Sequence, residues 1–285
     1  MYTTLISVSQ LKALLASKQP TLVFDCTFEL AQPLAGDAQY VQSHIAGAVR
    51  ADLDRHLSAK GAPDAASGGR HPLPSREKFA AWLGSLGFDN EMQAVVYDRQ
   101  NANYCGRLWW MLKWCGLDAV AVLDGGWQAW LAAGGATEAG EGPKLAASQF
   151  ALAHPKSSLV TTDDVARQLA RPFQTVIDAR AAPRYRGEME PLDPVAGHIP
   201  GALNRPFTEN FDGNGFFKPA GQLRAEFETL LAGRHPASVV HHCGSGVSAV
   251  PNLIAMEVAG LGSTALYAGS WSEWCSDPAR PVARG

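Results

Sequence analysis

The sequence lacks the features that would assign it to a class other than ordinary globular proteins. None of its apolar runs approaches the ~20 residues that a membrane-spanning helix needs. The first residues show no basic segment followed by an apolar one, so no signal peptide is expected. The net charge of -3 gives no electrostatic basis for binding nucleic acid or a membrane surface. With 285 residues, 46% of them hydrophobic and 18% charged, the chain is long enough for about two globular domains.

The five cysteines show no metal-binding spacing. No Cys-x-x-Cys pair occurs, and an odd number of cysteines cannot all be paired within the chain: Cys26, Cys105, Cys115, Cys243 and Cys275. Neither a disulfide framework nor a zinc site is expected from this pattern. We therefore expect a cytoplasmic protein with no metal and no organic cofactor.

Residues 239–249 have the pattern of a buried strand that ends in a tight loop before a helix. A short apolar run leads to Cys243, two glycines and two serines follow, and residues 250–258 have helical character. At such a junction the backbone N–H groups of the loop and of the first helical turn can point at one atom and stabilise an anion. A thiolate is an anion, so this setting favours the reactive form of a cysteine. Cys243 is the candidate nucleophile.

The landmarks of the first half of the chain return in the same order in the second half. Each half has a strand that ends in an acid, a His-Ile-x-Gly-Ala turn, a second buried strand and a glycine-tryptophan segment. The matched pairs are 21–25 with 175–180, 44–48 with 198–202, 94–98 with 239–243, and 125–130 with 269–274. This repeat predicts two homologous α/β domains, each a parallel sheet with helices on both faces.

The two predicted domains are 1–135 and 159–285. Residues 136–158 are rich in Gly, Ala, Pro and Ser with weak periodicity, which is typical of a linker. In the first copy Asp98 stands where the second has Cys243, and no glycine-rich loop follows it. A carboxylate cannot act as a sulfur nucleophile, so the first domain is expected to be non-catalytic.

These motifs resemble those of the two-domain rhodanese-like sulfurtransferases over nearly the whole chain. The loop from Cys243 to Ser248 is similar to the Cys-Gly-Ser-Gly-Val-Thr loop of the 3-mercaptopyruvate sulfurtransferases, with Ser248 in place of threonine. Thiosulfate-using rhodaneses typically carry basic residues inside this loop, and this loop has none. The paired His-Ile-x-Gly-Ala motifs and the Leu-Asp-Gly-Gly-Trp and Gly-Ser-Trp-x-Glu-Trp segments also match the family.

The resemblance implies a reaction in two halves. Cys243 would take the outer sulfur of a small anionic donor and become a persulfide. A thiol or cyanide would then accept that sulfur, and a thioredoxin-like reductant is a candidate acceptor. The backbone of Gly244, Gly246, Val247 and Ser248 would surround the terminal sulfur, since glycines let the chain curl closely.

The resemblance also implies a serine–histidine–aspartate triad, with Ser245 as its serine. His44 matches the histidine and Asp37 is the best match for the aspartate, although its spacing to the histidine differs from that of the family. The alternative for His44 is a buried turn histidine bonded to backbone, because His198 occupies the same motif in the second copy.

Arg184 matches the arginine that binds the donor in the family, and Arg186 is a second candidate. Mercaptopyruvate enzymes carry another arginine nine positions after the first, where this chain has Asp193. Either Arg186 or Arg107 holds the donor instead, or the preferred donor is thiosulfate. The loop favours mercaptopyruvate and we rank it first. The acidic residues Glu188, Glu190 and Asp193 are expected to form a solvated loop.

Two other functions compete with sulfur transfer. Cysteine phosphatases of related architecture need an arginine six positions after the cysteine, where this chain has Ala249. An inactive docking module is the second alternative, and the complete glycine-rich loop around Cys243 disfavours it.

Overall fold

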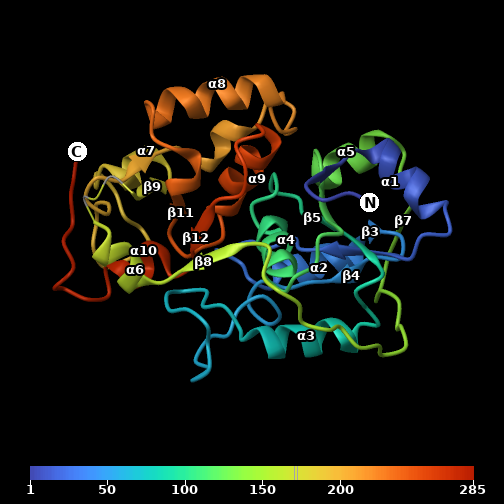
Figure 1. The fold of residues 1–285 in the computed structure, drawn as a ribbon. Helices are drawn as coiled ribbons and strands as arrows, with labels where there is room; N and C mark the ends of the chain where they lie inside the picture. Colours follow the sequence, from blue (N-terminus) through green and yellow to red (C-terminus); the bar gives the residue numbers. More distant parts are fainter. Residues whose placement is uncertain (170, 172) are drawn as a thin grey trace. The chain divides into compact units, whose positions relative to one another are not determined.

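The structure is a computed structural model that describes residues 1–169, 171 and 173–285 (Figure 1). Contacts divide the chain into two compact units. Unit 1 comprises residues 1–64, 74–156 and 213–217, and unit 2 comprises residues 65–73, 157–212 and 218–285. Two short segments, 65–73 and 213–217, therefore pack with the unit that holds the opposite half of the sequence. The domain boundaries at 135 and 159 stay a prediction.

Unit 1 contains a five-stranded parallel sheet with the strand order β1-β6-β5-β2-β4, and β3 pairs with β7 in a separate antiparallel ribbon. Its elements are β1 (Leu5–Ile6), α1 (Val8–Leu15), β2 (Thr21–Asp25), α2 (Ala35–Gln42), β3 (His44–Ile45), β4 (Val49–Arg50), α3 (Arg76–Ser85), β5 (Gln93–Tyr97), α4 (Cys105–Trp114), β6 (Val120–Leu123), α5 (Gly126–Ala132) and β7 (Thr137–Glu138).

Unit 2 contains a second parallel sheet, with the strand order β10-β9-β11-β12-β8. In Figure 1, α8 and α9 lie on one side of these strands and α6 and α10 on the other. The elements are β8 (Ser158–Val160), α6 (Thr162–Arg167), β9 (Thr175–Asp178), α7 (Ala182–Tyr185), β10 (Leu203–Asn204), the 3-10 turns η1 (Phe207–Asn210) and η2 (Pro236–Ser238), α8 (Ala220–Leu231), β11 (Val239–His242), α9 (Val250–Val258), β12 (Ala265–Tyr267) and α10 (Ser270–Trp274).

The two sheets have the same topology, so the predicted duplication and the predicted fold class are confirmed. Starting from β4 in the first sheet and from β10 in the second, the strand orders are β4-β2-β5-β6-β1 and β10-β9-β11-β12-β8. Each unit buries two tryptophans of its last helix against the sheet, Trp127 and Trp130 on α5 and Trp271 and Trp274 on α10. Burying large aromatic rings at matched positions contributes strongly to both cores.

Part of the predicted linker, residues 136–158, packs against unit 1. The amide of Ser148 donates to the carbonyl of Gly84 (2.9 Å), and the ring of Phe150 stacks on that of Phe88. Within the described ranges, every helix is too short or too polar to cross a membrane.

The central strand of each unit ends at a turn where the chemistry of the two copies differs. In unit 1, β5 is followed by Asp98, whose fully buried carboxylate accepts hydrogen bonds from four backbone amides. The donors are Gln100, Ala102, Tyr104 and Cys105, at 2.8–3.1 Å. Asn101 and Ala102 adopt positive φ angles of 54° and 57° to aim these amides inward. The turn of unit 1 therefore surrounds an anion that belongs to the chain itself.

We expect Asp98→Ala to lower the free energy of unfolding by about 3–5 kcal/mol, because four buried amides lose their acceptor. Urea denaturation followed by fluorescence measures this loss. Asp163→Ala is the matched control, since Asp163 is exposed, and it should change stability by no more than about 0.5 kcal/mol. A loss below about 1 kcal/mol for Asp98→Ala would show that the amides find other partners.

Candidate active site

Cys243 follows β11 directly and opens a buried loop that leads into α9. Cys243 is only 2% exposed. Gly246 has φ +70°, and a Cβ atom placed on it would lie 2.2 Å from the carbonyl oxygen of Ala268, so only glycine fits. Among the described residues the amides of Ser245, Val247 and Ser248 donate to no acceptor. The loop can therefore offer N–H groups to an anion beside the sulfur.

The first residues of α10 form hydrogen bonds with this loop. The amide of Cys243 donates to Ser270 Oγ (3.1 Å), and the amides of Trp271 and Ser272 donate to the carbonyls of Cys243 and Gly244 (3.0 and 2.9 Å). Ser270 takes a positive φ of 57° to do so, a conformation that costs free energy for a non-glycine residue. These contacts fix the backbone of Cys243 against the neighbouring turn.

A segment from the first half of the sequence, residues 68–71, also lies against this turn. The amide of Arg70 donates to Ser272 Oγ (3.0 Å). Cβ atoms placed on Gly68 and Gly69 would lie 2.5 Å from Glu273 Oε1 and 2.4 Å from the carbonyl oxygen of Gly269. Gly69, at φ +85° against a backbone carbonyl, is needed for this close approach, whereas at Gly68 the side chain of Glu273 would have to move. The segment, called here the 68–71 strap, brings two basic side chains to the cysteine loop.

His71 on the strap forms a hydrogen bond with Ser245. Its Nδ1 lies 2.9 Å from Ser245 Oγ, and the two residues are 2% and 7% exposed. The family resemblance predicted a histidine partner for Ser245, with His44 as the match. The histidine that the structure brings to Ser245 is His71.

His44 and Asp37 lie in unit 1 with partners of their own. His44 Nδ1 bonds the carbonyl of Tyr40 (2.7 Å) and its Nε2 faces Glu138 Oε1 (3.2 Å). His198 bonds the carbonyl of Tyr185 in the same way (2.8 Å), and each histidine stacks on its tyrosine. His44 is therefore a buried turn histidine bonded to backbone, which was the alternative interpretation. His198 plays the same structural part at the matching position of the repeat.

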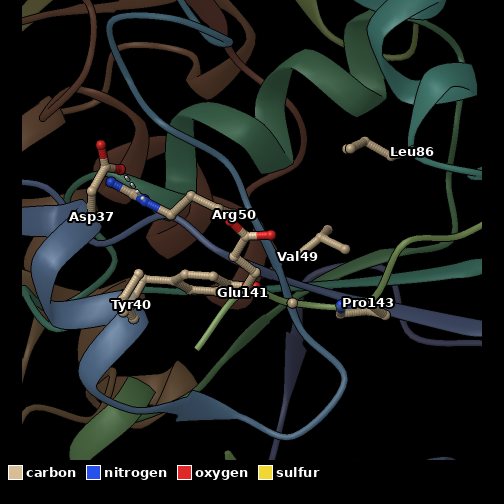
Figure 2. Close-up of a pocket in the computed structure, with 9 residues that line it drawn as sticks. Asp37, Tyr40, Val49, Arg50, Leu86, Glu141 and Pro143 are labelled. Carbon is tan, nitrogen blue, oxygen red and sulfur yellow. Dashed lines mark hydrogen bonds and ion pairs between the residues drawn. The ribbon is translucent and has the colours of Figure 1, made fainter. Parts of the chain in front are cut away.

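Asp37 belongs to an ion-pair cluster instead of a triad. Its Oδ1 accepts from Arg50 Nε (3.1 Å) and Arg55 Nη2 (2.6 Å). Figure 2 shows Asp37 facing Arg50 at the wall of a pocket that Tyr40 also lines. A carboxylate held by two arginines is not oriented toward His44, so the structure does not assemble the predicted Asp37–His44 pair.

Arg184 lies at the cysteine loop, and Arg186 does not. A Cβ atom placed on Gly244 would lie 3.5 Å from both terminal nitrogens of Arg184. Arg186 forms an exposed ion pair with Glu188 (2.6 Å). Arg107, the other candidate for the donor, is fully buried in α4 of unit 1.

The acidic segment after Arg184 is not a solvated loop, and that prediction is wrong for two of its three residues. The carboxylates of Glu190 and Asp193 are only 3% and 4% exposed. Glu190 accepts from Arg184 (2.6 Å) and Arg180 (3.2 Å), and Asp193 accepts from Arg70 (2.6 Å) and Arg184 (3.3 Å). Pairing with the arginines offsets the cost of burying these two carboxylates. The hydrophobic pattern of the sequence alone could not indicate such pairing.

Burial by itself acts to raise the pKa of Glu190, but hydrogen bonds from Arg184 and from the amides of Leu192 and Asp193 bring it below its ordinary value. Asp178 at the end of β9 behaves alike, since His242 and Arg180 outweigh its burial and lower its pKa. Burial acts to lower the pKa of His242, and although the charge of Asp178 opposes this, the pKa stays below its ordinary value. The carboxylates of Glu190 and Asp178 therefore stay ionised near neutral pH and balance the positive charge of the arginines.

Arg70 and His71 were not among the residues predicted for the site. The usable signal was the run Gly68-Gly69-Arg70-His71-Pro72, two basic residues between chain-bending residues in an otherwise polar segment. Nothing local links that run to Ser272, which is 202 positions away.

Comparisons with known proteins agree with this fold and site. The Rhodanese-like domain family matches residues 7–133 and 161–277. A probable 3-mercaptopyruvate sulfurtransferase of Pseudomonas aeruginosa is 46% identical over 285 residues, which is 99% of this chain and 98% of that protein. A Mycobacterium tuberculosis protein provisionally named thiosulfate sulfurtransferase SseB is 38% identical to this chain. The match covers 99% of this chain and 97% of that protein.

Solved structures give the same result. The 3-mercaptopyruvate sulfurtransferase from Leishmania major superposes with a TM-score of 0.81 at 32% identity, covering 96% of this chain and 74% of that one. Matching domains in both halves, relatives similar over the full length and a shared three-dimensional fold all point the same way. The chain belongs to the rhodanese-like sulfurtransferases, enzymes built from two tandem rhodanese-like domains.

Proposed function

We propose that the protein moves a sulfane sulfur from 3-mercaptopyruvate through a persulfide on Cys243 to a thiol or cyanide. The observation that carries the choice of donor is the contact between Ser245 Oγ and His71 Nδ1 (2.9 Å) inside a loop without charged side chains. When the carbon–sulfur bond of a ketone-bearing donor breaks, a proton must be donated or accepted at its oxygen or carbon. A serine–histidine pair can carry out this proton transfer. The names of the relatives from Pseudomonas aeruginosa and Leishmania major support the same donor.

In the first half-reaction the Cys243 thiolate attacks the donor sulfur and a sulfur–sulfur bond forms. The carbon–sulfur bond breaks, its electron pair goes to carbon as pyruvate enolate, and the thiol proton of the donor ends on that carbon to give pyruvate. In the second half-reaction a thiol or cyanide takes the outer sulfur and Cys243 returns as a thiolate. The amides of Ser245, Val247 and Ser248 are available to hold the anionic outer sulfur between the two halves.

His71 and Ser245 act on the donor and not on the nucleophile. A hydroxyl bonded to an imidazole can pass a proton in either direction, since the two ring nitrogens exchange roles with tautomer. Placed at the ketone, this pair stabilises negative charge on the enolate oxygen as the carbon–sulfur bond breaks. Thiosulfate leaves as sulfite and needs no such proton.

Thiosulfate is the second candidate donor. Asp193 stands where mercaptopyruvate enzymes carry their second arginine, and one relative of nearly equal coverage is named a thiosulfate sulfurtransferase. Thiosulfate carries two charges and no ketone, so it depends on Arg184 and the loop amides and not on Ser245.

The reaction suits the cytoplasm, with a thioredoxin-like protein as one candidate acceptor. All five cysteines are free, and a sulfur-carrying thiolate requires a reducing compartment to return to its starting state.

Cys243→Ser should abolish turnover with both donors, because a serine hydroxyl forms no persulfide. Mass spectrometry of the wild-type protein after mercaptopyruvate treatment should find one added sulfur on the peptide that contains Cys243. Cys275→Ser is the control for a second thiol of unit 2. A wild-type protein that gains no sulfur from either donor would refute sulfur transfer through this residue.

Ser245→Ala and His71→Ala should each lower kcat for mercaptopyruvate by about 100-fold, the range of a lost general acid–base group, and lower kcat for thiosulfate by less than about 5-fold. Side-by-side steady-state rates with cyanide measure the difference. His154→Ala, at an exposed histidine, should leave both rates unchanged. Equal losses with the two donors would contradict the proton role of the pair.

A further inference from the structure

A second pocket of unit 2 lies away from Cys243, at the other end of the strands that lead to it. Its volume is about 380 Å³, which is within the range of sites for small molecules. Residues on both sides of the start of β9, the turn at 200–201 and Arg234 line this pocket. The sulfur chemistry described above uses none of these residues, so the pocket is a candidate for a separate binding function.

The place of the pocket follows from the strand register. Val239 at the start of β11 pairs with Thr175 at the start of β9, and the pocket residues Gln174 and Val176 flank Thr175. Cys243 follows the opposite end of β11, which has four residues. Four residues of parallel strand span about 13 Å, so a small ligand in the pocket does not reach the sulfur.

The positive charge of this pocket is not compensated. Arg171 and Arg234 line it, both are exposed, and none of the lining residues is acidic. Among the described residues neither arginine forms an ion pair, and the guanidinium of Arg171 has no hydrogen-bond partner. Arg234 uses Nη1, which donates to the carbonyl of Leu231 (3.1 Å). The other guanidinium nitrogens of the two side chains are available to an oxyanion.

Another pocket of unit 2 shows the opposite arrangement. Its cations, Arg205 and Lys218, share the lining with Glu209 and Glu226. Glu226 accepts from Arg205 (2.7 Å) and from Lys218 (2.9 Å), so acids of the chain neutralise that site. The pocket at the start of β9 keeps its positive charge, which is the property that attracts an anion.

Neutral groups complete the lining. A Cβ atom placed on Gly201 would have no atom within 4 Å, so the backbone there is open. Among the described residues its N–H donates to no acceptor, and the side chain of Gln168 makes no hydrogen bond. Leu169 and Val176 add apolar surface. A ligand that suits this lining has one oxyanion group and a small body with both hydroxyl groups and carbon atoms.

We propose that this pocket binds a small phosphorylated metabolite, with Arg171 and Arg234 on the phosphate oxygens and with Gln168 and the Gly201 amide on the rest of the ligand. A phosphate monoester carries close to two negative charges near neutral pH, and guanidinium forks match its oxygens. A carboxylate carries one charge and would match only one of the two arginines. The site is independent of the proposed sulfur transfer because it neither contains nor reaches Cys243.

Isothermal titration calorimetry near neutral pH, with glycerol 3-phosphate as the probe and chloride as the only other anion, tests the site. The wild-type protein should bind one equivalent. Arg171→Gln and Arg234→Gln should each weaken the affinity about 10- to 100-fold, the effect of losing a charge-assisted hydrogen bond. Inorganic phosphate and sulfate lack the organic body and should bind at least about 5-fold more weakly than glycerol 3-phosphate, the effect of one lost neutral hydrogen bond.

Two controls locate the binding. Arg224→Gln removes the same charge from an exposed pair with Glu228 (2.9 Å) and should leave the affinity unchanged. Cys243→Ser should bind glycerol 3-phosphate as the wild-type protein does, and excess thiosulfate should not displace it. Failure of sulfur transfer, in which the wild-type protein gains no sulfur, therefore leaves this experiment intact. Melting temperatures of the arginine variants should equal that of the wild-type protein, because both side chains are exposed.

Four results would overturn the proposal. The first is a wild-type protein without saturable binding at millimolar glycerol 3-phosphate. The second is an equal loss of affinity in Arg224→Gln and Arg171→Gln, which would show a diffuse effect of net charge. The third is sulfate that binds as tightly as glycerol 3-phosphate, which would show an adventitious ion only. The fourth is displacement by thiosulfate, which would place the probe at the cysteine loop.

Discussion

Backbone amides that converge at the end of a central parallel strand require an anion, and both halves of this protein are built around that requirement. Desolvated N–H groups without an acceptor are costly. In unit 1 the carboxylate of Asp98 meets the requirement with four hydrogen bonds. In unit 2 the residue at that place is Cys243, and three amides of its loop have no acceptor among the described residues. The same turn thus has its amides satisfied by a carboxylate of the chain in one copy and leaves amides available to an anion in the other.

The charges around the cysteine loop are balanced within the protein. Arg70, Arg180 and Arg184 face Asp178, Glu190 and Asp193 in one connected set of ion pairs. Buried ions of one sign alone would be prohibitive, and pairing keeps each arginine charged and oriented. Asp193 joins Arg70 and Arg184, the two arginines nearest to Gly244.

Much of the architecture could be predicted because duplication doubles every local signal. The strand 21–25, the turn 44–48 and the segment 125–130 each had a counterpart, and the sheets follow the same order. The role of His44 was harder to judge. The repeat supplied the correct alternative, since His198 has the same backbone bond and the same stacked tyrosine. The buried acids Glu190 and Asp193 could not be predicted, because their burial depends on arginines that approach from other segments.

The sequence by itself determined the fold and the reaction class and predicted Cys243 as the nucleophile, since a cysteine in a glycine-rich turn after an apolar strand carries its chemistry locally. Only the tertiary structure decided which side chains surround that cysteine. The strap with Arg70 and His71 packs against α10 through two glycines and Ser272, from a position 202 residues away. Contacts of that range depend on close packing between surfaces that meet only after the sheet has formed. The turn sequence names the anion site, and the folded chain supplies the histidine and the arginine beside it.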